Sequence, residues 1–378
     1  MMRYLTPFLL KDLRKKTIFL SGPRQCGKTT LAKSLFPHKG CYLNWDISKE
    51  KLRISKMDWP ENASILVLDE LHKFRKWKNF LKGIMDSDEP KPPLLVTGSA
   101  RLETMKNAGD ALTGRYFHYR LHPIDLAESK LFFTGDSAEV RLQRLLKTGG
   151  FPESFLNPDD AERLCNDRFD LVVREDIRDL SQILSLSGFQ HLIEILRDRG
   201  AGIINYQNLS NDLHVSAPTV KQWVSLLERL FIIFLVYPFS GKFSRSLKKE
   251  PKFYFYDCSA SYSKRDAGNK LENLVACSLL KYCHFKRDTE GKKMELHYFK
   301  DRDQREVDFV VTYNHKPYWL IEVKTSDKTV SPHLLYLSQR VQCQSAIQLV
   351  YALKKNFETK NISVCNLPQW LEGLANKL

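Results

Sequence analysis

A short loop near the N-terminus contains the first residues that could do chemistry. Residues 22–29 read GPRQCGKT, which fits the phosphate-binding pattern G-x-x-x-x-G-K-[ST]. The apolar residues 17–20 before it are typical of a strand, and residues 30–36 after it are typical of a helix. In that setting the backbone N–H groups of the loop and the helix N-terminus face a bound phosphate. The sequence therefore predicts a nucleotide site in a strand–loop–helix unit.

Side chains of this loop have separate expected roles. We expect the Lys28 ammonium to contact the β- and γ-phosphates of ATP, and the Thr29 hydroxyl to hold the Mg²⁺ that accompanies them. The expected nucleotide contacts from the loop are Gly22, Pro23, Arg24, Gln25, Cys26, Gly27, Lys28, Thr29 and Thr30.

Two acids follow a continuous apolar run at residues 64–68. Such a run is typical of a strand that is buried on both faces of a parallel sheet. We expect this strand next to the strand of the phosphate loop, so that Asp69 holds the Mg²⁺ through water and Glu70 polarises the attacking water. Taken without the loop, the two acids are equally compatible with a solvated strand end.

Polar positions after two later strands are further candidates. A third apolar run ends at Thr97, and either Thr97 or Ser99 could contact the γ-phosphate or its water; the alternative is a turn that needs Gly98. Arg115 precedes an alternating strand and is a candidate arginine finger or γ-phosphate sensor. Arg101 competes for this role, and a plain surface position is the alternative for Arg115.

Composition and charge limit the class of protein. The chain has 378 residues, of which 43% are hydrophobic, so it can fold into two or three domains with sizeable cores. Its net charge of +15 favours nucleic acid, DNA above all, as a partner. The eight cysteines form no C-x-x-C pair, which favours a reducing compartment. The N-terminus is a poor signal peptide, and the longest apolar run is too short to span a bilayer. We expect a cytoplasmic protein with no membrane partner.

The middle of the chain changes to a helical pattern. Residues 123–183 carry apolar residues at three- and four-residue spacing, with a glycine-rich turn at residues 149–153, and predict a helical lid. The charged run at residues 174–179 is interpreted as a solvated helix face.

A helix-turn-helix is predicted after the lid. Residues 206–213 form its first helix and residues 217–230 its second, with Ser216 as the cap of the second. Residues 242–252, KFSRSLKKEPK, predict a basic wing. In a DNA reader the outward side chains of the second helix would meet the major groove; they are Thr219, Lys221 and Gln222. A winged helix that serves only for packing is the alternative.

A second group of chemically active residues lies near the C-terminus. Asp308 interrupts the apolar strand pattern of residues 306–311, and Glu322 and Lys324 share one face of the next predicted strand. Two carboxylates bind a hard divalent cation, and a lysine beside them stabilises a hydroxide or a phosphate. This D…E-x-K pattern predicts a metal-dependent nuclease site, with Glu272 as a candidate further acid. A structural salt bridge between Glu322 and Lys324 is the alternative.

Motifs along nearly the whole chain resemble those of one family. They are GPRQCGKT at 22–29, LVLDE at 66–70, TGS at 97–99, Gly114-Arg115, GGFP at 149–152, PKFYFYD at 251–257, LENLV at 271–275, EVDFV at 306–310 and IEVKT at 321–325. With these motifs the chain resembles the prokaryotic AAA+-type ATPases that carry a C-terminal domain of unknown function. It departs from them after Asp257, where Cys258-Ser259-Ala260 replaces the frequent Thr-Gly-Leu.

The resemblance implies an α/β fold with a P-loop AAA+ (RecA-like) parallel sheet and a helical lid. A winged helix-turn-helix and an α/β restriction-endonuclease-like domain follow. We place these parts at residues 1–122, 123–200, 201–257 and 258–378. Because Arg115 resembles the arginine of AAA+ enzymes, we also expect ATP hydrolysis at the interface of a homo-oligomer.

Three functions are compatible with these motifs. The leading prediction is an ATPase whose nucleotide state controls nucleic-acid binding and metal-dependent cleavage. The second is an ATP-switched DNA-binding regulator with an inactive nuclease fold, which the complete Asp308, Glu322 and Lys324 set disfavours. The third is an assembly ATPase that acts on protein partners, which the basic wing disfavours.

Overall fold

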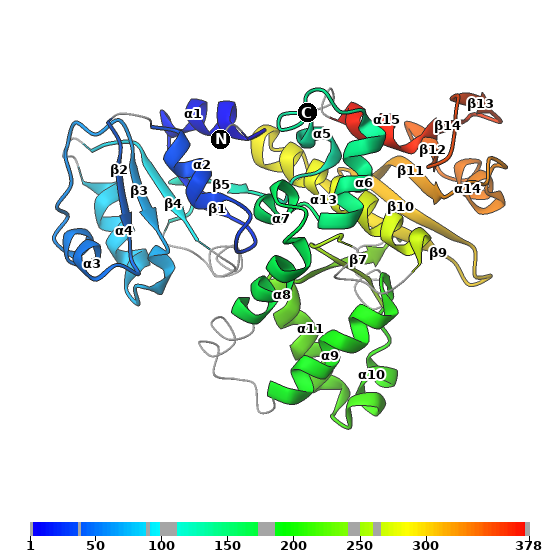
Figure 1. The fold of residues 1–378 in the computed structure, drawn as a ribbon, viewed down its shortest axis with the longest axis horizontal. Helices are drawn as coiled ribbons and strands as arrows, with labels where there is room; N and C mark the ends of the chain where they lie inside the picture. The colour runs from blue at the N-terminus through cyan, green and yellow to red at the C-terminus, as the bar shows by residue number, and fades with distance from the viewer. Residues whose placement is uncertain are drawn as a thin grey trace. The chain divides into compact units, whose positions relative to one another are not determined.

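The computed structural model describes residues 3–36, 39–87, 91–98, 112–172, 186–240, 250–259 and 266–374. The chain divides into two compact units, Met1–His122 and Pro123–Leu378 (Figure 1). The finer division into lid, winged helix and C-terminal domain stays a prediction. No helix in the described ranges combines the length and apolar character needed to cross a membrane.

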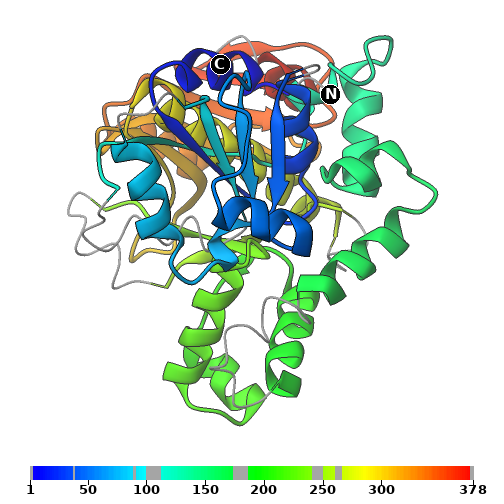
Figure 2. The ribbon, with the colours of Figure 1, turned by 90° about the vertical axis from the view of Figure 1, so that its left-hand side faces the viewer.

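The first unit is built around a five-stranded parallel sheet in the order β2-β3-β4-β1-β5, blue to cyan in Figures 1 and 2. Nearly every residue of β1, β3 and β4 is buried, which agrees with their continuous apolar sequences. The elements are α1 (Thr6–Leu13), β1 (Thr17–Ser21), α2 (Lys28–Ser34), β2 (Cys41–Asn44), α3 (Ser48–Ser55), β3 (Leu66–Asp69), η1 (Leu71–Lys73), α4 (Trp77–Asp86), β4 (Leu94–Thr97) and β5 (Tyr116–Arg120).

The strand order corrects one expectation. The acid-bearing strand β3 is not the neighbour of the phosphate-loop strand β1, because β4 pairs with both and lies between them. Sequence patterns give each strand's burial but not its place in the sheet, since any strand buried on both faces can occupy any interior position. The end of β4 at Thr97 therefore lies between the ends of β1 and β3.

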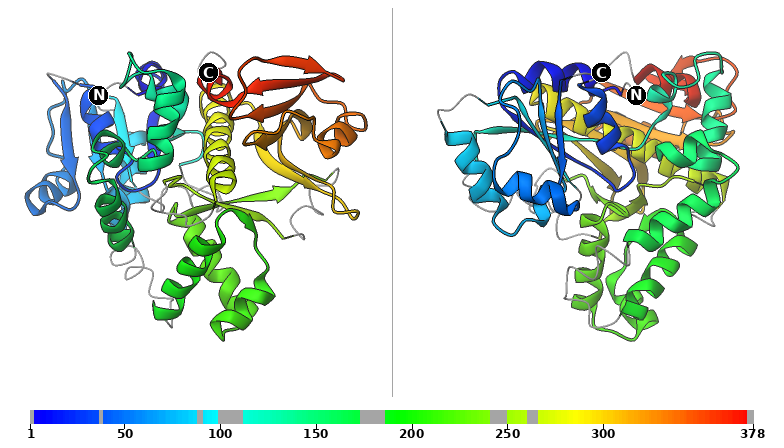
Figure 3. Two further views of the ribbon diagram at one scale, coloured as in Figure 1. Left: turned by 45° about the vertical axis from the view of Figure 1, so that its right-hand side comes forward. Right: turned by 60° about the vertical axis from the view of Figure 1, so that its left-hand side comes forward.

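The second unit joins a group of helices to a nine-stranded mixed sheet in the order β13-β14-β12-β11-β10-β9-β7-β8-β6. Figure 3 shows its long helix α13 in yellow beside the yellow-to-red strands. The helices are α5 (Leu126–Ser129), α6 (Ala138–Thr148), α7 (Pro152–Leu156), α8 (Ala161–Leu171), α9 (Leu186–Arg199), α10 (Tyr206–Leu213), α11 (Ala217–Arg229), α13 (Ala267–Glu290), α14 (Pro332–Ser338) and α15 (Leu367–Glu372). The strands are β6 (Gly202–Ile203), β7 (Ile233–Pro238), β8 (Lys252–Phe255), β9 (Met294–Lys300), β10 (Glu306–Tyr313), β11 (Lys316–Lys324), β12 (Ser345–Val350), β13 (Phe357–Thr359) and β14 (Ile362–Asn366).

The helix pair α10–α11 forms where the sequence predicts it. The Asn205 side chain accepts a hydrogen bond from Asn208 N at 2.8 Å, and Ser216 Oγ accepts one from Thr219 N at 3.3 Å, so the predicted Ser216 cap is confirmed. The apolar face of α11 packs into a buried cluster that includes Trp223 and Phe189. After α11, strand β7 pairs antiparallel with β8 and parallel with β9. The helix pair is therefore continuous with the sheet that also carries β10 and β11.

Helix α13 fixes several segments of the second unit through buried polar contacts. The Lys281 ammonium, 2% exposed, lies 2.9 Å from Asp125 Oδ1 and 2.7 Å from Glu128 Oε2. Eight residues earlier on α13, the Asn273 amide donates to Phe255 O at 2.9 Å and accepts from Phe255 N at 2.8 Å. These contacts compensate the cost of removing polar groups from water and fix the register between helix and sheet.

The glycine turn after α6 is a close-packed junction. Gly149 has φ +73°, and a Cβ at this position would lie 2.3 Å from Asp257 Oδ1. The Asp257 carboxylate forms a buried ion pair with Arg168, whose guanidinium lies 3.7 Å from the centre of the Phe151 ring. The GGFP motif is thus explained by packing: glycine admits the carboxylate, and phenylalanine supports its arginine partner.

We predict that Gly149→Ala destabilises the protein, since the new methyl group both strains the backbone and displaces the Asp257 carboxylate. The expected cost is about 1–3 kcal/mol, or a few degrees in the midpoint of the corresponding thermal transition. Gly135→Ala is the matched control, because nothing lies within 4 Å of a Cβ there. Differential scanning calorimetry measures both, and equal midpoints for the two variants would contradict this account.

Candidate nucleotide site and candidate acidic site

The phosphate loop has the shape that its sequence predicts. Gly22 directly follows β1 and has φ +149°. A Cβ there would lie 2.2 Å from Leu121 O, so this backbone position admits only glycine. The Lys28 side chain, 7% exposed, folds over the loop and donates to Gly22 O at 2.9 Å and Pro23 O at 2.6 Å. A cation is therefore held above the loop at the N-terminus of α2, where phosphates would bind.

Asp69, at the end of β3, contacts residues from β2, β4 and the loop helix α2. Its Oδ2 accepts hydrogen bonds from Thr29 Oγ1 at 2.8 Å and from Tyr42 OH at 2.6 Å. Its Oδ1 accepts from Glu70 N at 3.1 Å and from the Thr97 hydroxyl. The structure thus places the two expected Mg²⁺ residues, Thr29 and Asp69, in direct contact, and the hydroxyl and carboxylate are the oxygen donors that this ion prefers.

Tyr42 is a site residue that sequence reasoning missed. Burial raises the pKa of its phenol, and the hydrogen bond to Asp69 raises it further, so the phenol is a stable donor to that carboxylate. The available signal was a tyrosine in the β-prone residues 41–45, CYLNW, but strands often contain tyrosine for packing alone.

Glu70 lies beside the loop lysine in an unusual backbone conformation, with φ +55° and ψ +22°. Burial raises the pKa of its carboxyl, although the Lys28 charge lowers it. Its buried Oε2 has no hydrogen-bond partner, and the basic nitrogens within 4 Å of it are His72 Nε2 at 3.6 Å and Lys73 Nζ at 3.8 Å. A carboxylate with an open oxygen in this position can accept a proton from a water molecule.

Arg115 directly precedes β5, the neighbour of β1, and lies at the N-terminal ends of these strands, whereas the phosphate loop lies at their C-terminal ends. The parallel register pairs Thr17 with Tyr116 and Ser21 with Arg120, so about four residues of strand, roughly 13 Å, separate Arg115 from the loop end. Its Nε donates to Asp86 Oδ1 at 2.7 Å, and its side chain is 39% exposed. Arg115 does not reach the phosphates bound by its own chain. Ser99 and Arg101 lie outside the described residues, whereas Thr97 contacts Asp69.

The second candidate site lies on β10 and β11. Their antiparallel register places Phe309 opposite Ile321 and hence Asp308 opposite Glu322, as the sequence predicts for neighbouring strands. Val323 N donates to Asp308 Oδ2 at 2.8 Å, and Lys324 Nζ lies 2.8 Å from Glu322 Oε1. The three residues of the D…E-x-K pattern therefore come together.

A second lysine joins this acidic site and corrects its sequence assignment. Lys252, expected at the end of a basic wing, is 5% exposed on β8. Its ammonium lies 2.6 Å from Glu306 Oε1 and 3.2 Å from Glu272 Oε1, and Tyr254 OH donates to the same Glu272 oxygen at 2.7 Å. Lys252 is thus a buried counter-ion and is not available to a DNA backbone. The other wing residues, 242–249, lie outside the described residues, as do residues 174–179.

The buried Asp308 carboxyl lies near two other carboxylates and one lysine. Burial raises the pKa of its carboxyl well above the usual range, and repulsion by Glu272 and Glu322 raises it further, against the opposing charge of Lys252. The buried Glu322 Oε2 has no hydrogen-bond partner. Both facts fit an additional cation between Asp308 and Glu322. Within the described ranges no group of three or more His, Cys, Asp or Glu side chains could hold a metal ion, so Glu272 does not complete a third ligand.

The outward residues of α11 keep part of their expected exposure. Lys221 and Gln222 are exposed, whereas Thr219 is half-buried and its hydroxyl contacts Ser216 Oγ at 2.8 Å. The helix can therefore present Lys221 and Gln222 to a partner.

Comparison with known proteins agrees with the fold of the first unit. Residues 14–130 match the family described as AAA domain, residues 139–270 match a domain of unknown function (DUF8612), and residues 267–370 match a domain of unknown function (DUF4143).

Two curated relatives cover most of the chain. An uncharacterized protein of Methanocaldococcus jannaschii is 23% identical over 408 residues, covering 91% of this chain and 83% of the relative. An uncharacterized protein of Mycobacterium tuberculosis is 20% identical over 334 residues, covering 84% of this chain and 72% of the relative.

A solved structure is also similar, at 13% identity and a TM-score of 0.28. It is a signal transduction ATPase with numerous domains and a tetratricopeptide repeat sensor, from Pyrococcus horikoshii. The similarity covers 74% of this chain and 47% of that one, and this TM-score is too low to support an argument about fold or function. The family matches and the parallel sheet with its phosphate loop agree with each other. The chain joins an AAA domain to a C-terminal segment that matches the DUF4143 domain.

Proposed function

We propose that the chain hydrolyses ATP at its phosphate loop and uses the nucleotide state to control nucleic-acid binding and metal-dependent phosphodiester cleavage by its C-terminal part. The observation that carries the cleavage proposal is the meeting of Asp308, Glu322 and Lys324 beside an unpartnered Glu322 oxygen. Glu322 and Lys324 could by themselves be a structural pair. The raised pKa of the opposing Asp308 carboxyl, however, indicates a place where a further cation would be stabilised.

The AAA domain carries groups that suit phosphate binding, Mg²⁺ binding and activation of water. Lys28, held by loop carbonyls, can transfer its hydrogen bonds to phosphate oxygens, and Thr29 with Asp69 can hold Mg²⁺. Bound Mg²⁺ would neutralise part of the phosphate charge. Glu70 then orients the attacking water and accepts its proton, because its open carboxylate oxygen lies beside the loop.

Hydrolysis at a subunit interface follows from the position of Arg115. Arg115 lies at the N-terminal ends of the strands, away from the phosphate loop of its own chain. It can therefore stabilise transition-state charge only on a nucleotide that a second chain holds. Its exposed side chain, paired with Asp86 at the surface, is accessible to such a neighbour. A homo-oligomer is therefore part of the proposal.

In the acidic site Asp308 and Glu322 would hold a divalent cation, and Lys324 would stabilise negative charge on the reacting phosphate. The cation would polarise the phosphate and lower the pKa of a bound water. Support for a nucleic-acid substrate comes from the net charge of +15 and from the exposed Lys221 and Gln222 on α11.

One observation favours a second candidate function, an ATP-switched nucleic-acid-binding regulator without cleavage. Glu272 is held by Lys252 and Tyr254, so the described part of the chain supplies two free acidic ligands rather than three. Nuclease assays with Mg²⁺ or Mn²⁺ on plasmid, linear and single-stranded DNA, with and without ATP, distinguish the two functions.

We predict that Lys28→Ala binds ATP about 10- to 100-fold more weakly, because a charge-assisted contact to phosphate is lost. Glu70→Gln should keep ATP affinity and hydrolyse about 100- to 10,000-fold more slowly, since the amide keeps the shape but cannot accept the proton. Calorimetry and phosphate release measure the two effects, with the exposed Lys49→Ala as control. Normal turnover by Lys28→Ala would refute the site.

Arg115→Ala is expected to retain ATP binding and to lose hydrolysis by about 1,000-fold or more, the range seen for arginine fingers supplied in trans. Mixing experiments test the trans geometry. A chain with Arg115→Ala and a chain with Glu70→Gln are each inactive, but a mixture should recover activity at interfaces that combine the intact Arg115 and the intact Glu70. Full activity from a chain that stays monomeric with ATP would exclude the interface.

Asp308→Asn should abolish cleavage while ATP hydrolysis continues, with the exposed Glu358→Gln as the matched control. A readout without activity comes from pH. Because the native pKa of Asp308 is raised, the metal-free native state binds its proton more tightly than the unfolded chain does. Stability should therefore fall as pH rises from the ordinary carboxyl range through the raised pKa.

The asparagine variant lacks this titration, so its thermal midpoint at pH 8 should exceed that of the wild type without metal. Mn²⁺ should then raise the midpoint of the wild type but not of the variant. Identical Mn²⁺ uptake by both proteins, together with no cleavage under any nucleotide condition, would leave the regulator as the supported function.

A further inference from the structure

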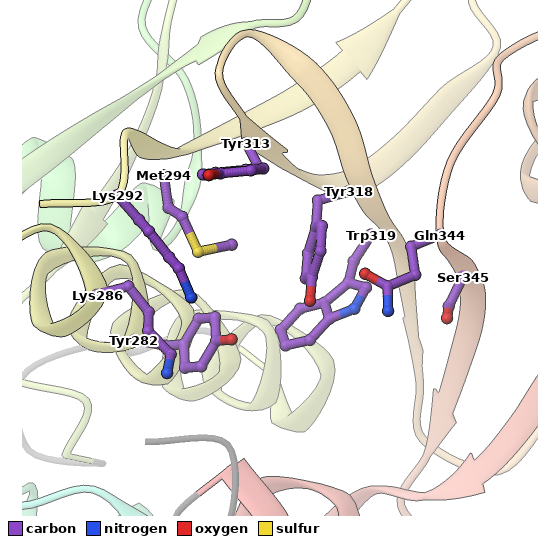
Figure 4. A pocket seen from close by; sticks show the side chains of 9 residues that line it. All are labelled: Tyr282, Lys286, Lys292, Met294, Tyr313, Tyr318, Trp319, Gln344 and Ser345. Carbon is purple, nitrogen blue, oxygen red and sulfur yellow. The ribbon is translucent and has the colours of Figure 1, made fainter. Parts of the chain in front are cut away.

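A cavity in the second unit lies apart from both candidate sites. It has a volume of about 390 Å³, within the range of small-molecule sites. Figure 4 shows its lining, which comes from the end of α13, the turn after it, and β9, β10, β11 and β12. Trp319 of this cavity and Glu322 of the acidic site are three residues apart on a regular stretch of β11, so their side chains leave opposite faces of the sheet.

One side of the cavity is aromatic. The Tyr318 ring lies between its neighbours, 5.1 Å from the Trp319 ring and 6.5 Å from the Tyr313 ring, measured between centroids. Tyr313 is 38% exposed at the rim, whereas Trp319 is 3% exposed and stacked against Tyr282 at 5.0 Å. A buried aromatic floor with a more exposed ring beside it can receive a flat ligand by stacking.

The other side of the cavity is cationic. Lys286 Nζ and Lys292 Nζ lie 2.5 Å and 2.6 Å from the two carboxylate oxygens of one residue, Glu290. Two ammonium groups thus share a single carboxylate, which leaves a local net charge of one positive unit. In Figure 4 the Lys292 ammonium and the Tyr318 hydroxyl face the space from opposite sides. An anionic group entering here would add the charge that this cluster lacks.

We propose that this cavity binds a nucleotide, with the base stacked on the Tyr318 side and the phosphate at Lys286 and Lys292. A flat ring joined to an anion matches both sides of the cavity. The aromatic side alone would equally suit an apolar ligand, and the cationic side alone would equally suit a simple anion. The Gln344 amide and the Ser345 hydroxyl, at the remaining edge, can hydrogen-bond the edge of a base. The ligand is either a free nucleotide or one nucleotide of a single strand.

This inference goes beyond the proposed function, because it needs neither ATP hydrolysis nor the acidic site. Its test uses the full chain carrying Lys28→Ala, so that nucleotide binding by the phosphate loop is weakened. The probes are thymidine monophosphate, thymidine and a fluorescein-labelled oligothymidylate of eight nucleotides, followed by calorimetry or fluorescence anisotropy at low salt.

Three substitutions give different signatures. Tyr318→Leu should weaken thymidine monophosphate and thymidine alike, by about five- to 100-fold, because stacking is lost. Lys292→Gln, at an exposed position, should weaken only the monophosphate, by about three- to tenfold. Glu290→Gln should strengthen the monophosphate and leave thymidine unchanged, since a carboxylate that competes for both ammonium groups is removed. Phe357→Leu, at an exposed aromatic position on β13, is the control.

Saturable binding of the monophosphate with these signatures assigns the cavity to a free nucleotide. Binding of the oligothymidylate alone, weakened by both Tyr318→Leu and Lys292→Gln, assigns it to a single strand. Absence of binding by all three probes, or equal binding by wild type, Tyr318→Leu and Lys292→Gln, overturns the proposal. Neither result changes the Mn²⁺ and cleavage readouts of Asp308→Asn, so failure here is distinguishable from failure of the proposed nuclease.

Discussion

The second unit depends on one physical constraint: a charge removed from water must have a partner of opposite charge close by. Lys281 meets this requirement between Asp125 and Glu128, and Arg168 meets it against Asp257. Removing one partner of a buried pair typically costs about 3–5 kcal/mol, whereas the intact pair adds little net stability. Such pairs therefore act mainly by excluding other arrangements, and here they fix where the chain segments before α6 and after β8 must lie.

The acidic site is where this constraint is met only in part. Lys252 and Lys324 each form an ion pair with a neighbouring acid. Burial and the nearby carboxylates nevertheless raise the pKa of Asp308, and one oxygen of Glu322 has no hydrogen-bond partner. The buried ion pairs of Lys281 and Arg168 are complete by comparison, so the incomplete pairing at Glu322 differs from both. Unsatisfied buried polar atoms are costly, and a chain that keeps one usually does so for a ligand.

Local sequence predicted the parts of the structure that depend on neighbours along the chain. The glycine loop, the helix after it, the strand ending at Asp69 and the Ser216 cap all follow from short-range patterns, and the structure has each of them. Strand order did not follow, because the placement of β4 between β1 and β3 is decided by packing among segments that are distant in sequence. Tyr42 was therefore missed as a partner of Asp69, and the role of Thr97, which also contacts Asp69, was left open.

Lys252 shows the same limit of local sequence, because its neighbours along the chain predict exposure and the fold buries it. Its neighbours in sequence, a run of lysines, serine and arginine, are typical of a solvated basic segment. Burial of Lys252 results from the pairing of β8 with β7 and from Glu272 on α13, and neither partner is close in sequence. Aromatic residues of the cavity beside β11 were likewise unrecognisable as a group, because they gather from β10, β11 and α13.

The parallel pairing of β7 with β9 has a geometric consequence. Helix α11 leads into β7, and the acidic residues lie on β10 and β11, two and three strands further along the same hydrogen-bonded sheet. A sheet of this kind transmits position rather than motion, because sliding one strand would break a whole ladder of hydrogen bonds. If a duplex is held by α11, the acidic residues sit at a set distance from that point. Breaks in the nucleic acid would then fall at a constant distance from the place of binding, whatever the sequence between them.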